Sequence, residues 1–269
     1  MKLSKLMTVG LMAATWAMVG TTSVNAEVDA KAKGLEIATE WDNRDLGFKD
    51  STATMKMVLE NRHGQKSERK MRQIILEIPD LEVGDKSLTV FDHPRDVKGT
   101  AFLSYAKILD PDDQWLYLPA LKRVKRISSK NKSGPFVGSE FAYEDLSSRE
   151  LKKFTYTWLR DEKCGDLDCF VLEQIPTYEN SGYTRTEVWY DKDEYRQLKI
   201  DFYDRKNALL KTLTYGDYRQ YLGKYWRSHD MYVVNHQTGK KTRLLFDEMQ
   251  FQTGVSDKDL SKNSLKRSR

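Results

Sequence analysis

The sequence predicts a mainly β protein, in which one large antiparallel sheet curls into a barrel or half-barrel. Three observations lead to this fold class. After Asp50 the apolar residues recur with a period of two, in many short runs. Turn sequences such as DKDEY, DRKNA and NHQTG separate these runs. Only an N-terminal helix and one aromatic segment break the rhythm, and a sheet with one apolar face needs such elements to cover it.

The chain opens with the features of a secretory signal peptide, which we assign to residues 1–26. Lys2 and Lys5 form a short positive region, residues 6–19 are apolar, and the small residues VNA precede Glu27. The apolar run is shorter than the roughly 20 residues that span a bilayer, which favours cleavage over the alternative of an uncleaved anchor. We therefore expect a soluble periplasmic protein.

Residues 27–269 are expected to form a single domain. No linker rich in Pro, Gly or Ser divides them, and single β domains reach about 250 residues. The formal net charge is +5 for the whole chain, and it falls to +3 when Lys2 and Lys5 leave with the signal peptide. Because an exported protein rarely meets nucleic acid, local basic runs are better suited to anionic lipid headgroups or to an acidic face of a partner.

The first element is a helix over residues 28–42, because its small and apolar residues follow the spacing of one helical face: Ala30, Gly34, Ile37, Ala38 and Trp41. Strands follow it. In the clearest of them, Leu198, Ile200 and Phe202 alternate with polar neighbours. The expected strands are 51–60, 69–78, 86–92, 99–109, 114–119, 123–128, 152–162, 169–176, 184–191, 196–204, 208–218, 224–235 and 241–251.

Residues 131–148 do not alternate. They contain Gly134, Pro135 and Gly138 together with two phenylalanines. With the N-terminal helix, this segment is the only obvious cover for the apolar face. We expect it to close the mouth of a barrel or to act as a movable lid over a cavity.

Cys164 and Cys169 are the only cysteines of the chain. In an oxidising compartment they can form a disulfide, and the intervening Gly165 and Asp166 suit the end of a hairpin. So short a loop gives a model stabilisation of only roughly 2 kcal/mol. The alternative is a pair of reduced thiols. A zinc site would need further ligands nearby, and the sequence offers none.

A search for catalytic motifs finds none. G-x-S-x-G, H-E-x-x-H and a glycine-rich phosphate loop before a helix are all missing. The four histidines lie in turns or at polar strand positions without the spacing of metal ligands. We therefore expect neither an enzyme nor a cofactor. An apolar cavity for acyl chains competes with an ordinary side-chain-filled β core, because a small closed barrel fills its interior with side chains.

The order of the motifs GLEIATEWDNRDLGFKDS, VKGTAFLSY and DDQWLYLPALKRVKRISSKNKSGPFVGSEFAYEDL resembles the outer membrane lipoprotein-sorting protein family, a LolA-like group of periplasmic proteins. The resemblance extends from about Gly34 to the C-terminal DLSKNSLKR. It implies a LolA/LolB-like curved antiparallel half-barrel, with an N-terminal helix and a lid segment covering the concave face. It also implies a carrier of lipid or lipoprotein acyl chains, and a partner among the RND/MMPL-type inner-membrane transporters.

On this reading, alternation and the lid assignment give a lipid cavity at the level of a region. Its expected residues are Met55, Met57, Leu59, Leu103, Trp115, Tyr117, Phe136, Phe141, Tyr143, Trp158 and Phe202. The expected basic rim consists of Lys122, Arg123, Lys125 and Arg126, part of a run of six Lys and Arg within eleven residues. This rim either binds an anionic headgroup or protects the end of a strand from pairing with another chain.

Three functions remain open at this point. The first is a non-enzymatic carrier that transfers lipid or lipoprotein between the inner and outer membranes, with transient membrane contact. The second is a non-carrier adaptor of an RND/MMPL-type envelope lipid transporter, with a filled core. The third is an envelope hydrolase, for which no nucleophile–base pair is evident. The cargo need not be lipoprotein, because residues 27–269 exceed the length of LolA itself. Sterols, hopanoids and fatty acids are equally allowed.

Overall fold

The computed structural model describes residues 20–80 and 82–267. The predicted signal peptide, residues 1–26, lies largely outside the described residues. Helix α1 (Gly20–Asp45) begins before the predicted cleavage site and contains the expected helix 28–42. No helix among the described residues has the length and the apolar character needed to cross a membrane.

Thirteen antiparallel strands form a single sheet, and each lies in or next to a predicted run. The strands are β1 (Asp50–Glu60), β2 (Lys66–Leu76), β3 (Val83–His93), β4 (Ala101–Lys107), β5 (Asp113–Leu118), β6 (Arg123–Ile127), β7 (Phe154–Cys164), β8 (Leu167–Pro176), β9 (Tyr183–Asp191), β10 (Gln197–Asp204), β11 (Leu209–Tyr221), β12 (Tyr225–Asn235) and β13 (Lys241–Phe251). A C-terminal turn of helix, α2 (Ser264–Arg267), follows them.

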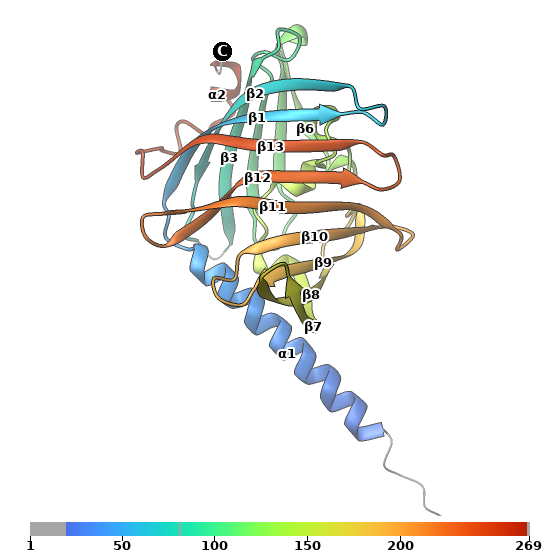
Figure 1. Cartoon of the computed structure of the whole chain (residues 1–269). Helices are drawn as coiled ribbons and strands as arrows, with labels where there is room; N and C mark the ends of the chain where they lie inside the picture. Colours follow the sequence, from blue (N-terminus) through green and yellow to red (C-terminus); the bar gives the residue numbers. More distant parts are fainter. Residues whose placement is uncertain (1–19, 81, 268–269) are drawn as a thin grey trace, which may run out of the picture.

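The strand order is β6-β5-β4-β3-β2-β1-β13-β12-β11-β10-β9-β8-β7. Strands that pair in the sheet are consecutive in the sequence, with the exception of β1 and β13. Conversely, β6 and β7 are consecutive in the sequence but do not pair. Because β6 and β7 are the two edges, the sheet is curved but not closed (Figure 1). The predicted half-barrel is confirmed.

The connection between the two edges is residues 128–153, which we call the plug segment. It contains four short 3-10 helices: η2 (Ser129–Asn131), η3 (Phe136–Gly138), η4 (Tyr143–Leu146) and η5 (Leu151–Lys153). Pro135 and Ala142 form an isolated β-bridge within it. Since the segment joins opposite edges of a curved sheet, it crosses the concave face, as expected for the predicted lid.

Helix α1 packs mainly on β7 (Figure 1). Gly34, Ile37 and Ala38 are buried, as their spacing predicts. A Cβ atom at Gly34 would lie only 2.7 Å from the backbone nitrogen of Trp158, so glycine lets the helix approach the strand closely.

The sheet has a core on each face. The larger core lies on the concave face, under the plug segment and α1, and includes Phe102, Phe136 and Phe141. The second core lies on the opposite face of β3, β4 and β5. There Leu260 and Leu265 of the C-terminal segment pack against Leu88, Val90, Ala101, Leu103, Trp115 and Tyr117. Most of β3 to β5 is therefore covered on both faces, whereas the first half of β3 is half-exposed on its concave side.

Candidate functional site

A cavity of about 620 Å³ lies on the concave face. Its lining comes from the first half of β1, the second half of β2, the first half of β3, and the ends of β11, β12 and β13 that lie beside them. All of these belong to one end of the sheet. The plug segment fills the other end, so the concave face is half filled and half hollow.

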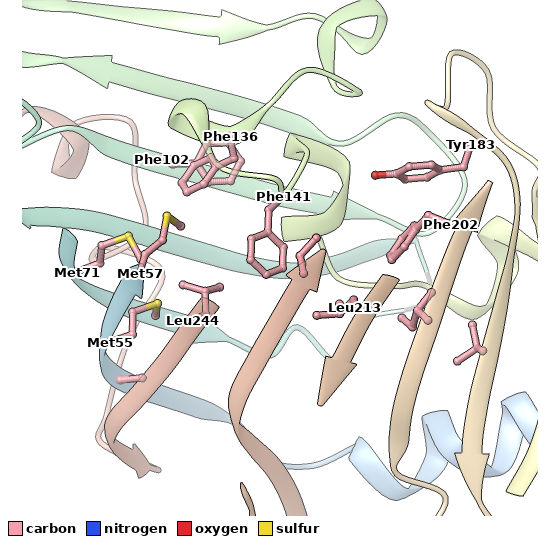
Figure 2. Close-up of a cluster of buried hydrophobic side chains, with 14 of the residues drawn as sticks. Met55, Met57, Met71, Phe102, Phe136, Phe141, Tyr183, Phe202, Leu213 and Leu244 are labelled. Atoms are coloured by element: carbon pink, nitrogen blue, oxygen red, sulfur yellow. The ribbon is translucent and has the colours of Figure 1, made fainter. Parts of the chain in front are cut away.

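One wall of the cavity is apolar and rich in methionine. Four of the nine methionines of the chain lie within residues 1–19, and the other five all line the cavity: Met55, Met57, Met71, Met231 and Met249. Ala53, Leu244 and Phe246 complete this apolar wall. Figure 2 shows Met55, Met57 and Met71 grouped together, with Met55 directly opposite Met71 across β1 and β2. Methionine side chains are flexible and polarisable, and they adapt to ligands of varied shape.

The adjoining wall, which comes from β3, β4 and Gln73 of β2, is mainly polar, and Ile75 of β2 borders it. It consists of Gln73, Asp85, Ser87, Thr89 and Ser104. Gln73 lies opposite Thr89 and Ser87 lies opposite Ser104 in the strand register. These side chains face the cavity because the apolar residues that alternate with them, such as Leu88 and Leu103, face the second core. The cavity is therefore amphipathic.

Asp85 is the titratable group of the polar wall. Its carboxylate accepts a hydrogen bond of 3.0 Å from the backbone N–H of Ile78. Burial nevertheless raises the pKa of Asp85 to about 7, and the negative charges of Glu150 and Glu77 add to the rise. A Cβ atom at residue 84 would clash with the Glu150 carboxylate and with the Cβ of Ala106, so glycine at this position lets Glu150 lie close to the strand.

The mouth of the cavity carries four cations and aromatic side chains. The cations are Arg44, Arg196, Lys224 and Arg227. Each has a partner: Arg44 binds Glu40 at 2.7 Å, Arg196 binds Asp191 at 2.8 Å, Arg227 binds Asp45, and Lys224 donates to the carbonyl of Leu46. Trp226, Tyr195 and Tyr218 lie among them. The mouth is therefore polar without an excess of unpaired positive charge.

Buried polar contacts hold the plug segment to the sheet. The ammonium group of Lys211, on β11, lies 2.5 Å from Asp145 and 2.9 Å from the carbonyl of Glu140. Tyr183 donates to Asp145 at 2.8 Å, and the Arg69 guanidinium donates to the carbonyl of Val137. The predicted lid is thus bound to the sheet at several points along its length.

Among the predicted cavity residues, Met55, Met57 and Phe136 line the cavity. Phe141, Tyr143 and Phe202 belong to the same core but lie at the end that the plug segment fills. Leu59 also packs against that core and lines a separate groove. Trp158 lies under α1, where the Lys33 ammonium is 3.4 Å from the centroid of the Trp158 ring. The residues that line the cavity differ from the others in their position along the strands. Alternation predicts which face a residue is on, but not which end of the sheet is hollow.

The placement of Leu103, Trp115 and Tyr117 in the cavity is wrong. All three belong to the second core, on the opposite face of the sheet. Alternation correctly put them on one face of their strands, but it does not say which face is concave. Because the C-terminal segment covers the other face of β3 to β5, that face is as apolar as an interior face is expected to be, and this misled the assignment.

The predicted basic rim does not border the cavity. Arg123, Lys125 and Arg126 lie on the edge strand β6, and Lys122 precedes them. All four are exposed, and none contributes to the cavity lining. Arg126 pairs with Asp113 of the neighbouring strand. Their position on an edge strand agrees with the alternative interpretation, in which charge discourages pairing with another chain.

Sequence reasoning missed Met71, Met231, Met249 and the whole polar wall. The methionines carried a usable signal, because all five that follow residue 26 line one cavity. The polar wall carried none, because serine and threonine alternating with apolar residues are typical of any half-exposed strand.

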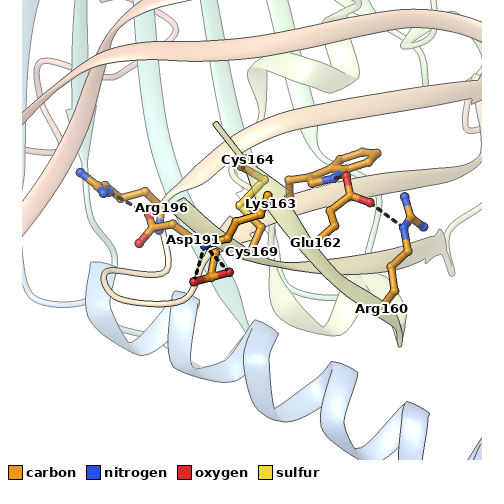
Figure 3. Close-up of a disulfide and its surroundings, with 9 residues drawn as sticks. Arg160, Glu162, Lys163, Cys164, Cys169, Asp191 and Arg196 are labelled. Atoms are coloured by element: carbon orange, nitrogen blue, oxygen red, sulfur yellow. Dashed lines mark hydrogen bonds and ion pairs between the residues drawn. A yellow bond between two sulfur atoms is a disulfide. The ribbon is translucent and has the colours of Figure 1, made fainter. Parts of the chain in front are cut away.

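The predicted disulfide between Cys164 and Cys169 is present, with a Cα–Cα separation of 6.1 Å. It links β7 to β8 at the end of their hairpin, next to the ion pair of Lys163 and Asp168 (Figure 3). The bridge lies away from the cavity lining. Among the described residues, no cluster of three His, Cys, Asp or Glu side chains is arranged to hold a metal ion.

Comparison with known proteins places this chain in a family. A family model described as "uncharacterized protein" matches residues 84–267. An outer membrane lipoprotein-sorting protein domain from Vibrio parahaemolyticus is 60% identical in sequence, with a TM-score of 0.86 over 88% of this chain and 100% of that chain. The chain therefore belongs to the outer membrane lipoprotein-sorting protein family.

Two further structures extend the comparison. A DUF1329 family protein from Desulfovibrio piger is 28% identical, with a TM-score of 0.83 over 88% of this chain and 99% of that chain. A LolA superfamily protein from Nitrosomonas europaea is 20% identical, with a TM-score of 0.68 over 86% and 98%. The latter shows that the fold is LolA-like. None of the curated proteins matches this sequence.

Proposed function

We propose that this protein is a non-enzymatic carrier of the periplasm. It holds a lipid, or the acyl chains of a lipoprotein, during transfer between the inner and outer membranes. The observation that carries this proposal is the hollow half of the concave face, with its methionine-rich wall. A core built only for stability would be packed without such a void.

The size of the cavity suits one lipid molecule. Ligand pockets commonly measure about 300–1,000 Å³, and this one measures about 620 Å³. If a methylene group occupies roughly the volume of a water molecule, about 30 Å³, the cavity holds about 20 methylene groups. Burial of an acyl chain contributes about 0.8 kcal/mol per methylene, so a dozen buried methylenes contribute roughly 10 kcal/mol before the costs of binding.

An affinity of this size lets the carrier keep its cargo in water, but it slows release. We propose that an RND/MMPL-type transporter of the inner membrane loads the cavity. Signal-peptide removal after residue 26 would release the protein into the periplasm. The family resemblance supports the transporter as partner, and the basic, apolar and small residues of 1–26 support the cleavage. No covalent chemistry is needed, because extraction and release depend only on access to the cavity.

The second candidate function is a transporter adaptor that carries no cargo. The exposed basic strand β6 favours it. Arg123 and Lys125 do not line the cavity, and both are exposed where they can contact an acidic partner. An adaptor would not need the hollow, so blocking the hollow separates the two candidates.

Ala53→Phe tests the carrier proposal. Ala53 lines the cavity, whereas the next residue, Thr54, is exposed on the opposite face of β1. A phenyl ring at residue 53 should fill part of the hollow and lower the amount of lipid that copurifies with the protein, measured by mass spectrometry of lipid extracts. Thr54→Phe is the matched control and should retain the wild-type amount. Equal lipid content in both variants, with both folded by circular dichroism, would contradict the carrier function.

A further inference from the structure

We propose that the polar wall selects the cargo, and that the cargo is a lipid whose polar group is an uncharged hydroxyl or amide. This group lies inside the cavity, beside the chain that contacts the methionine-rich wall. The inference rests on the proposed carrier function and adds to it the chemical class of the ligand.

The first observation is that the polar wall offers free hydrogen-bonding groups. Across the described residues, nothing hydrogen-bonds to the side chains of Gln73, Ser87 or Thr89. Thr89 is 7% exposed and lines the cavity, so a ligand in the hollow can contact its side chain. A purely apolar chain held against this wall would displace water from these groups and leave them unpaired, which costs free energy. A ligand with its own hydrogen-bonding group avoids that cost.

The second observation is that these groups form one patch. Gln73 and Thr89 are directly opposite each other on β2 and β3, and Ser87 is the next residue of β3 on the same face. Adjacent strands lie about 4.8 Å apart, so the amide and the two hydroxyls are within reach of a single ligand group. Together they offer both donors and acceptors, as an alcohol or an amide requires.

The third observation is the charge around the patch. The nearest ionisable groups are acidic: Asp85 lies two residues from Ser87 on the same strand face, and Glu150 and Glu77 add negative charge around it. No cation belongs to the polar wall, and the cations of the mouth already have partners. A carboxylate or phosphate on this wall would lose its hydration without gaining a counter-ion.

The experiment is a competition between two probes with the same acyl chain length: a monoacylglycerol and a fatty acid. The delipidated full-length mature protein is mixed with equimolar probes at pH 7.5, and bound species are quantified by native mass spectrometry. We expect the monoacylglycerol to be bound at least about tenfold more than the fatty acid. The carboxylate finds no counter-ion on the polar wall, and each well-formed hydrogen bond contributes up to about a tenfold change in affinity.

The variant Ser87→Ala/Thr89→Val removes both hydroxyls and keeps the shape of the wall. It should reduce the preference for the monoacylglycerol about tenfold or more while still binding the chain. Thr54→Val, which removes an exposed hydroxyl from the opposite face of β1, is the control and should keep the full preference.

The outcomes separate the two proposals. A fatty acid bound as well as the monoacylglycerol, or an unchanged preference in the double variant, would overturn the cargo class and leave the carrier function standing. If neither probe binds, both the cargo class and the carrier function fail.

Discussion

Lys211 is almost fully buried and binds the plug segment through Asp145 and the carbonyl of Glu140. Replacing it with methionine keeps most of the length of the side chain but leaves the buried Asp145 without its cationic partner. Removing one partner of a buried ion pair typically costs about 3–5 kcal/mol. We therefore expect Lys211→Met to lower the free energy of unfolding by about that amount in urea titrations.

Lys206→Met is the control for this prediction, because Lys206 is exposed at the turn before β11. Its cost should stay within about 0.5 kcal/mol. If the two variants were equally stable, the plug segment would not depend on the Lys211 contact.

Asp85 gives a prediction about pH. Its pKa is about 7 in the folded protein and lower in the unfolded chain, so the folded state holds the proton more tightly. Stability is therefore lost as the pH rises from about 4 to about 7. Asp85→Asn removes this titration. The free energy of unfolding of the variant, measured relative to that of the wild type, should therefore rise by about 3 kcal/mol from pH 5 to pH 8.

Chemical denaturation at both pH values measures this difference. Glu248→Gln, an exposed carboxyl on β13, serves as the control and should show no comparable change. A relative stability of Asp85→Asn that does not change with pH would mean that Asp85 ionises as readily in the folded protein as in the unfolded chain.

At the scale of elements, the docking of α1 depends on Gly34. Alanine favours an isolated helix over glycine by about 1 kcal/mol. At this position, however, its Cβ would lie 2.7 Å from the backbone of Trp158. We expect Gly34→Ala to lower the melting temperature, the opposite of the effect of helix propensity. Leu35→Ala, at an exposed position of the same helix, should change it little. A higher melting temperature for Gly34→Ala would contradict this expectation, because it would mean that the helix and the backbone of Trp158 move apart at little cost.

Most elements could be predicted from the sequence, because the helix and the strands are encoded by local periodicity. Residues such as Ile200 and Phe202 have the alternation that predicts β10. Which face of a strand is concave could not be predicted, and for Leu103 and Trp115 the assignment was wrong. That choice depends on the C-terminal segment, whose Leu260 lies more than 140 residues away from both in sequence.

The candidate site was predictable only in part, for a similar reason. Met55, Met57 and Phe136 were placed in the cavity correctly. The hollow itself depends on how far the plug segment extends along the concave face. That extent is set by long-range contacts, such as those of Lys211 and Asn235 with Glu140. Local patterns carry no information about them.

At the scale of the whole molecule, the topology explains why a half-barrel of this kind has both a plug and a hollow. The chain builds β1 to β6 outward from the centre, crosses to the other edge, and returns through β7 to β13. The single long connection must pass over the concave face. It covers one end of that face, and the methionine-rich wall and the polar wall remain at the other end.

The most direct measurement is native mass spectrometry on the mature protein, purified from the periplasm without detergent, together with lipid extraction. The account predicts one bound lipid per protein, with a mass that fits a cavity of about 620 Å³. It also predicts that the extracted lipid has an uncharged polar group. A protein that is empty as purified, and that stays empty after incubation with envelope lipids, would contradict the carrier function and favour the transporter adaptor.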